Sequence, residues 1–169
     1  ILSGKEIVKR LGKEIIIEPF IERVNPNSYN LSLHNELMIY DHAELDMAKP
    51  NPASTIHIPE SGYVLQPNTL YLGRTNEYTR TDGYIPMLEG RSLSVVSAIH
   101  PRYGRFWRRR FAGYWTLESF VSSPYGLPQC RICQIYYHDI DGEYDKYTHG
   151  KYQNNTGIQR ACFGKTLKK

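Results

Sequence analysis

One glutamate, Glu118, lies in the middle of a largely apolar, strand-forming run at residues 113–120. Tyr114, Trp115 and Leu117 favour β-strands, and a charge inside such a strand is costly unless it is paired or used. A buried glutamate also tends toward a raised pKa, which suits a group that takes up and returns protons near neutral pH. We therefore predict that Glu118 is a general acid–base in a buried strand. The alternative is a glutamate at a strand edge that faces solvent.

A second candidate block, Gly90-Arg91-Ser92, follows a strand-like run and could hold a phosphate. Glycine lets the backbone approach a ligand closely, arginine binds a phosphate with two parallel hydrogen bonds, and serine adds a hydroxyl. The alternative for so short a motif is a simple turn.

The polar segment at residues 139–159 is a third candidate, because it contains Tyr144, Lys151, Tyr152 and Asn155. Tyrosine can stack on a base or donate to a phosphate, and lysine is a point charge for phosphate. The segment has few apolar residues, so we expect it to be ordered only if another group ties it down. The alternative is a solvated polar tail.

Two further segments must be compared with a zinc-binding signature. Zinc-dependent base deaminases carry His-x-Glu followed by Pro-Cys-x-x-Cys. This chain has His-Asn-Glu at 34–36 and Pro-Gln-Cys-Arg-Ile-Cys at 128–133. An extra glutamine interrupts the second motif, and 96 residues separate His34 from Cys130. Both motifs also lie in strand-like surroundings, whereas zinc chemistry of this kind uses helix N-termini. We therefore predict no zinc, with His34 a half-exposed strand residue and Cys133 part of the core.

Taken in order, the blocks at 88–92, 113–120 and 150–159 resemble those of the deoxycytidine triphosphate (dCTP) deaminase family. The run Asn-Pro-Asn-Ser-Tyr-Asn-Leu at 25–31 also matches, and its turn residues and amides indicate a structural role. The resemblance covers nearly the whole chain. It implies an all-β, distorted jelly-roll or barrel domain like that of deoxyuridine triphosphatase (dUTPase), spanning residues 1–169. It also implies a tail at 143–169 that closes over the nucleotide, and a homotrimer with nucleotide sites between subunits.

By this resemblance the chain hydrolyses dCTP to dUTP and ammonia, which supplies dUTP for thymidylate synthesis. Glu118 would deprotonate a water that attacks C4 of cytosine and then protonate the departing nitrogen. Mg²⁺ would accompany the triphosphate. The implied substrate contacts are Arg91, Ser92, Thr116, Leu117, Tyr144, Lys151, Tyr152 and Asn155. Family members usually have glutamine near Asn155, so this contact departs from the pattern.

Three alternatives to this activity stay open. The first is a related hydrolase that cleaves dUTP to dUMP, or that performs both reactions. The second is a nucleotide-binding relative without catalytic activity. The third is a nucleic-acid binder that uses the basic and aromatic residues at 102–110.

Residues 92–110 depart from the family pattern, and shifted reading frames would explain the departure. Codons that encode residues 93–98 and 99–110 permit the family's motifs when they are read in another frame, and residues 160–169 behave in the same way. As written, the chain lacks the family's second arginine near 95–96. It also has Arg108 where the family has an aspartate, ten residues before Glu118. We predict small frameshifts in the gene or its reading, with impaired or absent activity for the chain as written.

Short strands are predicted to position these residues. A capping box of Ser3 and Glu6 begins a helix at residues 3–12, which Gly12 can end. Helical periodicity then disappears. The candidate strands are residues 28–33, 36–40, 55–58, 63–65, 70–75, 84–89, 114–120 and 131–138. Many short strands separated by turn residues predict an all-β sandwich or barrel.

The composition agrees with one packed domain, since 40% of the 169 residues are apolar. No run approaches the roughly 18 apolar residues of a membrane span, and no signal peptide is visible, so we expect a cytoplasmic protein. The three cysteines fit reduced thiols. Five arginines at 102–110 account for the net charge of +4, since +4 − 5 leaves −1 for the rest. Because the positive charge is confined to this one cluster, it argues against nucleic-acid binding by the domain as a whole.

Overall fold

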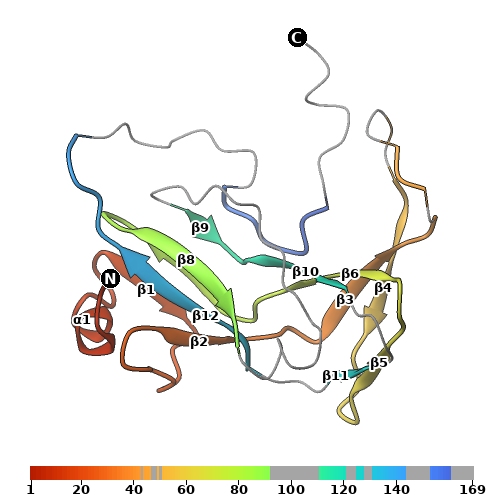
Figure 1. Cartoon of the computed structure of the whole chain (residues 1–169), viewed down its shortest axis with the longest axis horizontal. Coiled ribbons are helices and arrows are strands. Elements are labelled where there is room, and N and C mark those ends of the chain that lie inside the picture. The colour runs from red at the N-terminus through yellow and green to blue at the C-terminus, as the bar shows by residue number, and fades with distance from the viewer. Residues whose placement is uncertain are drawn as a thin grey trace.

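The computed structural model describes residues 1–42, 44–46, 49, 51–91, 111–120, 125–127, 131–143 and 153–160. Within this part of the chain, strands dominate and the one helix is short, which confirms the all-β prediction (Figure 1). The elements are α1 (Gly4–Lys9), β1 (Ile15–Glu18), β2 (Tyr29–Ser32), β3 (Glu36–Tyr40), β4 (Ala53–His57), β5 (Tyr63–Leu65), β6 (Leu70–Arg74), β7 (Tyr78–Thr81), β8 (Ile85–Gly90), β9 (Ala112–Gly113), β10 (Thr116–Phe120), β11 (Tyr125–Leu127) and β12 (Arg131–His138). No helix in the described ranges is long and apolar enough to cross a membrane.

The described strands form antiparallel sheets of two to four strands. Their orders are β1-β7-β9, β10-β6-β3-β4, β11-β5 and β2-β12-β8. Most neighbours in a sheet are distant in sequence; β12, for example, lies between β2 and β8. The residues that position Glu118 therefore come from several parts of the chain, because β10 pairs with β6 and β6 with β3.

The helix α1 begins where the sequence predicts. The Ser3 hydroxyl caps it by accepting from the Glu6 N–H at 3.3 Å. The Glu6 carboxylate accepts from Lys9 at 2.7 Å and from Arg10. These basic groups hold the pKa of Glu6 at about 2. The helix ends at Lys9, earlier than predicted, and Gly12 beyond it has a positive φ of 76°.

Strand prediction succeeded where side chains alternate or lie in apolar runs. The strands predicted at 36–40, 63–65 and 131–138 have these bounds in the structure. The strand predicted at 114–120 begins two residues later, as β10 at Thr116, because the Trp115 N–H donates to the Thr75 side chain and not to a neighbouring strand. Four of the described strands were missed: β1, β7, β9 and β11. The sequence of β7, Tyr-Thr-Arg-Thr, is polar, and its place between β1 and β9 comes from pairing with distant residues.

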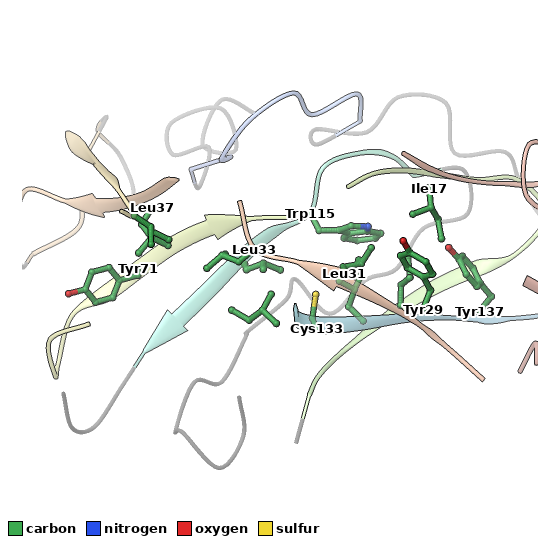
Figure 2. Packing of buried hydrophobic residues seen from close by; sticks show 14 of the residues in the cluster. Ile17, Tyr29, Leu31, Leu33, Leu37, Tyr71, Trp115, Cys133 and Tyr137 are labelled. Atoms are coloured by element: carbon green, nitrogen blue, oxygen red, sulfur yellow. The ribbon is translucent and has the colours of Figure 1, made fainter. Parts of the chain in front are cut away.

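The core is one continuous cluster between the sheets. In Figure 2 it extends from Ile17 and Tyr137 at one end, past Trp115, to Leu37 and Tyr71 at the other. Cys133 lies in its middle without any exposed surface, as predicted for a core residue. Leu117 of β10 belongs to the same cluster, so the strand that carries Glu118 is fixed from within.

Candidate functional site

Side chains of β10 alternate between the core and the outer face. Leu117 is fully buried and Ser119 is nearly so, while Thr116 is half-buried and Glu118 is exposed. Successive residues of a strand point to opposite sides, so burying Leu117 turns Glu118 outward. The prediction of a buried Glu118 is therefore wrong for the single chain. Glu118 lies at the accessible surface of the outer strand of a sheet, paired opposite Leu72 of β6.

A buried polar junction anchors the chain immediately before β10. The backbone of Trp115 donates its N–H to the Thr75 hydroxyl at 3.0 Å and accepts from the Thr75 N–H at 2.9 Å. The indole N–H donates to the Thr79 hydroxyl at 2.8 Å, and the indole stacks on Phe111. The Thr75 hydroxyl in turn donates to the Glu77 carbonyl at 2.9 Å. These bonds fix the backbone three residues before Glu118, so they help to set the position of the Glu118 Cα atom.

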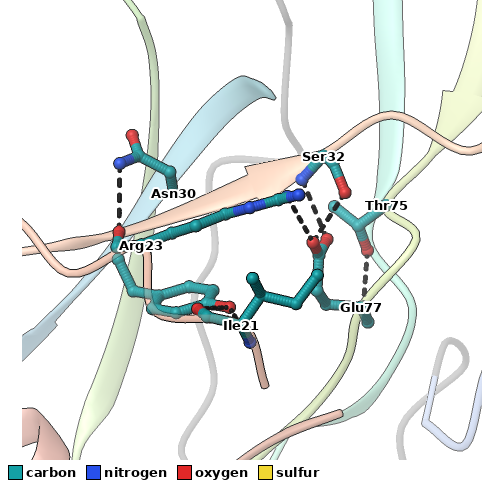
Figure 3. A network of polar contacts seen from close by, with 7 residues as sticks. Ile21, Arg23, Asn30, Ser32, Thr75 and Glu77 are labelled. Atoms are coloured by element: carbon teal, nitrogen blue, oxygen red, sulfur yellow. Dashed lines mark hydrogen bonds and ion pairs between the residues drawn. The ribbon is translucent and has the colours of Figure 1, made fainter. Parts of the chain in front are cut away.

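The carboxylate of Glu77 is the centre of the adjoining network (Figure 3). It is 1% exposed and accepts from the Ser32 N–H at 2.9 Å and the Ser32 hydroxyl at 2.6 Å. The Arg23 guanidinium lies 3.5 Å away. Buried carboxylates need such partners, and here the partners tie β2 to the loop before β7. Glu77 therefore has a structural role.

The run at 25–31 is structural, as predicted. Asn25 donates to the Ser28 hydroxyl at 2.9 Å, and Ser28 donates to Gln134 of β12 at 2.9 Å. Asn30 donates to the Arg23 carbonyl at 3.0 Å. These amides replace backbone partners in the turn that leads into β2.

Residues 153–160 run along β9 and β10, as the darkest blue segment in Figure 1 shows. Asn155 forms a parallel bridge with Gly113. Further along, the Gln159 N–H donates to the Thr116 hydroxyl at 2.9 Å, and Arg160 donates to the Asn51 carbonyl at 3.0 Å. We expected this stretch to need a nucleotide to hold it, but contacts within the chain place it against β10.

The structure thus brings only some of the expected substrate contacts together. Thr116 and Asn155 lie on the two sides of the contact between β10 and the tail segment. Leu117 points into the core, so only its backbone can contact a ligand. Arg91 is half-buried directly after β8, which belongs to a different sheet from β10, and its N–H donates to the Ile132 carbonyl at 3.3 Å. Ser92, Tyr144, Lys151 and Tyr152 lie outside the described residues, as do the arginines at 102–110.

His34 is partly exposed between β2 and β3, close to its predicted setting. Its Nδ1 lies 3.7 Å from Glu36, and His57 lies 4.0 Å from the same carboxylate. Partial burial and the Arg74 guanidinium lower the pKa of His34, against the opposing effect of Glu36. No group of three or more His, Cys, Asp or Glu side chains in the described ranges could hold a metal ion. Cys130 is outside those ranges, so the absence of zinc stays a prediction.

No pattern in the sequence indicated the residues that anchor β10. Thr75 was predicted only as the last residue of the strand at 70–75, and Glu77 follows two residues later with no local pattern that indicates a distant partner. The partners of Thr75 and Glu77 are about 40 residues away in sequence. A third unexpected contact places the Arg74 guanidinium 4.6 Å from the centre of the Tyr114 ring, in the geometry of a cation–π interaction.

An all-β chain with a glutamate on the outer face of an anchored strand defines the class of fold and site. The family model described as dCTP deaminase-like matches residues 1–140, and the chain belongs to this family. The match ends just before the residues that we expected to form the tail. The family that the sequence motifs indicated is therefore confirmed.

The chain is similar over its whole length to relatives named "dCTP deaminase, dUMP-forming". The relative from Clostridium beijerinckii is 58% identical over 173 aligned residues, which cover 100% of this chain and 99% of the relative. The relative from Clostridium acetobutylicum is 59% identical, with 98% of this chain and 97% of the relative covered.

A solved structure has the same fold. The crystal structure of 2′-deoxycytidine 5′-triphosphate deaminase from Agrobacterium tumefaciens aligns with a TM-score of 0.66 and 17% identity. The alignment covers 81% of this chain and 47% of that chain. At this identity the likeness concerns the fold alone, and it confirms the dUTPase-like jelly roll.

Proposed function

We propose that this chain hydrolyses dCTP by deaminating the cytosine and releases dUMP as the final nucleotide. The observation that carries the proposal is the position of Glu118, outward-facing on a strand whose backbone Thr75 and Trp115 fix. The family membership and the names of the full-length relatives support the substrate.

Glu118 acts on the base in the first step. Its carboxylate takes a proton from a water molecule whose oxygen attacks C4 of cytosine, and the C4–N4 bond then breaks as the amino nitrogen leaves protonated. The products of this step are dUTP and ammonia. An exposed carboxylate suits a site completed by a second subunit, which would remove water from around Glu118 when the nucleotide binds.

The product is where the sequence-based expectation needs correction. We expected release of dUTP, whereas the relatives' names specify a dUMP-forming deaminase. A second water then attacks the α-phosphorus of dUTP, the bond to the bridging oxygen of the β-phosphate breaks, and pyrophosphate leaves. The sum is dCTP plus two waters giving dUMP, ammonia and pyrophosphate. This corresponds to the bifunctional alternative that the sequence left open.

The triphosphate contacts follow from the sequence motifs. The residues that would bind the phosphates are Arg91, Ser92, Tyr144, Lys151 and Tyr152. The Thr116 hydroxyl and the backbone of Leu117 would border the base beside Glu118. Mg²⁺ enters as part of the substrate, bound to the triphosphate. The frame-shifted reading of 92–110 predicts that these contacts are incomplete in the chain as written.

A homotrimer and a cytoplasmic location belong to the same proposal. The trimer is tested by light scattering of the purified protein, where three times the mass of one chain is expected. A monomer that turns over dCTP would contradict a site shared between subunits.

The deciding experiment incubates the purified full chain with dCTP and Mg²⁺ and separates dUTP, dUMP and pyrophosphate over time. Formation of dUMP with equal pyrophosphate and ammonia supports the proposal. Accumulation of dUTP without dUMP would restore the simple deaminase. If dCTP stays intact while dUTP is cleaved, the chain is a dUTP diphosphatase. Nucleotide binding without any product identifies a non-catalytic relative, and restoring the frame-corrected sequence at 92–110 then tests whether that segment is the cause.

A further inference from the structure

The tail segment at residues 153–160 is joined to the strand block by alternating hydrogen bonds that need no ligand. The Asn154 N–H donates to the Ala112 carbonyl at 2.8 Å, and the Tyr114 N–H donates to the Asn155 carbonyl at 3.1 Å. Together with the bridge between Gly113 and Asn155, these bonds add the tail to β9 as a short parallel partner. The attachment leads directly into β10, where Gln159 donates to Thr116 at 2.9 Å.

Asn155 is the residue that makes this attachment specific. Its side-chain NH₂ donates to the Tyr114 carbonyl at 3.0 Å, and its side-chain oxygen accepts from the Gly157 N–H at 3.2 Å. One side chain thus serves both the strand block and the turn that follows in the tail. A side chain whose two polar ends are engaged within the chain is poorly placed to contact a nucleotide as well.

The opposing backbone is shaped for this contact. Gly113 has a φ of 143°, and a Cβ built there would lie 2.8 Å from the Asn155 nitrogen and 2.9 Å from its carbonyl oxygen. Any larger residue at 113 would push the tail away. Asn154 adopts a φ of 59°, a left-handed conformation that asparagine tolerates better than most residues. Both sides of the junction therefore carry residues that its geometry requires.

We propose that Asn155 is a positioning residue that latches the tail to the strand block before the nucleotide binds. The latch holds residues 153–160 beside Thr116, two residues from Glu118. It thereby fixes the tail segment beside the strand that carries Glu118. This inference rests on the proposed function, because the purpose of the latch is to present the tail to the nucleotide that Glu118 acts on. It replaces a direct substrate contact for Asn155.

The test compares three variants of the full chain without ligand by hydrogen–deuterium exchange. Asn155→Ala loses both side-chain bonds, and Asn155→Asp keeps the acceptor for Gly157 but puts an oxygen opposite the Tyr114 carbonyl. Thr156→Ala alters an adjacent exposed side chain and serves as the control. The amides of Tyr114 and Asn154 should exchange roughly 5- to 100-fold faster in both Asn155 variants, that of Gly157 should do so only in Asn155→Ala, and all three should exchange at the normal rate in the control.

Kinetics with dCTP and Mg²⁺ measure what the latch contributes to the reaction, while the ligand-free exchange separates a latch from a direct contact. With a latch, KM should rise by a similar factor in the Asn155 variants while kcat changes less, because fewer molecules hold the tail in the competent position. Unchanged exchange in ligand-free Asn155→Ala would overturn the proposal, whatever happens to KM. If no variant or wild type turns over dCTP, the proposed function fails, but the exchange rates still decide whether the latch exists.

Discussion

Two glutamates of this chain, Glu77 and Glu118, differ in nearly everything except their side chain. Glu77 is 1% exposed and accepts from Ser32 and Arg23, while Glu118 faces outward on β10. The buried carboxylate joins parts of the fold, and the exposed one is where the proposed chemistry takes place. Burial of a carboxylate is therefore a poor guide to catalysis here, because the interior uses Glu77 to satisfy donors and leaves Glu118 accessible to water and substrate.

The two glutamates are also connected. Thr75 donates to the Glu77 carbonyl and accepts from the Trp115 N–H, so one hydroxyl links the buried network to the strand of Glu118. We therefore expect substitution of Glu118 to affect activity, substitution of Glu77 to affect stability, and substitution of Thr75 to affect both.

Glu118→Gln is expected to have the largest effect. Loss of the acid–base group should lower kcat for dCTP deamination by about 10²–10⁴-fold while the protein stays as stable as wild type. Steady-state kinetics and thermal unfolding measure the two. Glu18→Gln, on the exposed end of β1, is the matched control and should be indistinguishable from wild type. Near-normal turnover by Glu118→Gln would show that Glu118 is not the acid–base group. The proposed difference in role between Glu118 and Glu77 would then be wrong.

Glu77→Ala should act on stability instead. It leaves the Ser32 N–H and the Arg23 guanidinium without their acceptor, and hydrogen bonds to a charged group contribute about 1.5–3 kcal/mol each. We expect a loss of about 3 kcal/mol in the free energy of unfolding, measured by urea titration at pH 7. Glu77→Gln keeps the shape and one acceptor oxygen, so it should lose less. A loss in Glu77→Ala below about 1 kcal/mol would mean that water replaces the carboxylate.

Thr75→Val tests the link between the two regions. Valine has nearly the same shape but leaves the buried Trp115 N–H without an acceptor, at a cost of about 1–3 kcal/mol. Because the same bond fixes β10, kcat should also fall in the molecules that remain folded. Thr75→Ser retains the hydroxyl and should recover most of both properties. Should Thr75→Val lose stability but keep full kcat, the anchor would matter for folding alone.

His34 gives the smallest expected effect and extends the comparison to Glu36, a third and partly exposed carboxylate. Partial burial and Arg74 lower the pKa of His34 below its ordinary value of about 6.5. The unfolded chain then binds the proton more readily, so His34 contributes stability above about pH 6.5 that is lost as pH falls through that value toward the lowered one. His34→Gln should flatten this part of the stability–pH curve. An unchanged slope between pH 7 and 5 would show that other groups cause it.

Several features of this protein were determined by the sequence alone. Runs such as Arg131–His138 carry strand-forming residues bounded by turn signals, and their bounds were predicted correctly. The Ser3 cap is a local bond between residues three apart, so it too could be read from sequence. Glu118 and the motifs around it were found because a charge in an apolar strand is unusual, and the family that they indicated is confirmed.

Only the tertiary structure decided which way Glu118 faces and what holds its strand. The burial of Leu117 turns the glutamate outward. The sequence does not show which face of this strand packs against the core, because both faces carry apolar and polar residues. The hydrogen bonds of Thr75, Glu77 and Asn155 join residues about 40 positions apart. Such contacts follow from the pairing of strands that are distant in sequence, and no local pattern of residues encodes them.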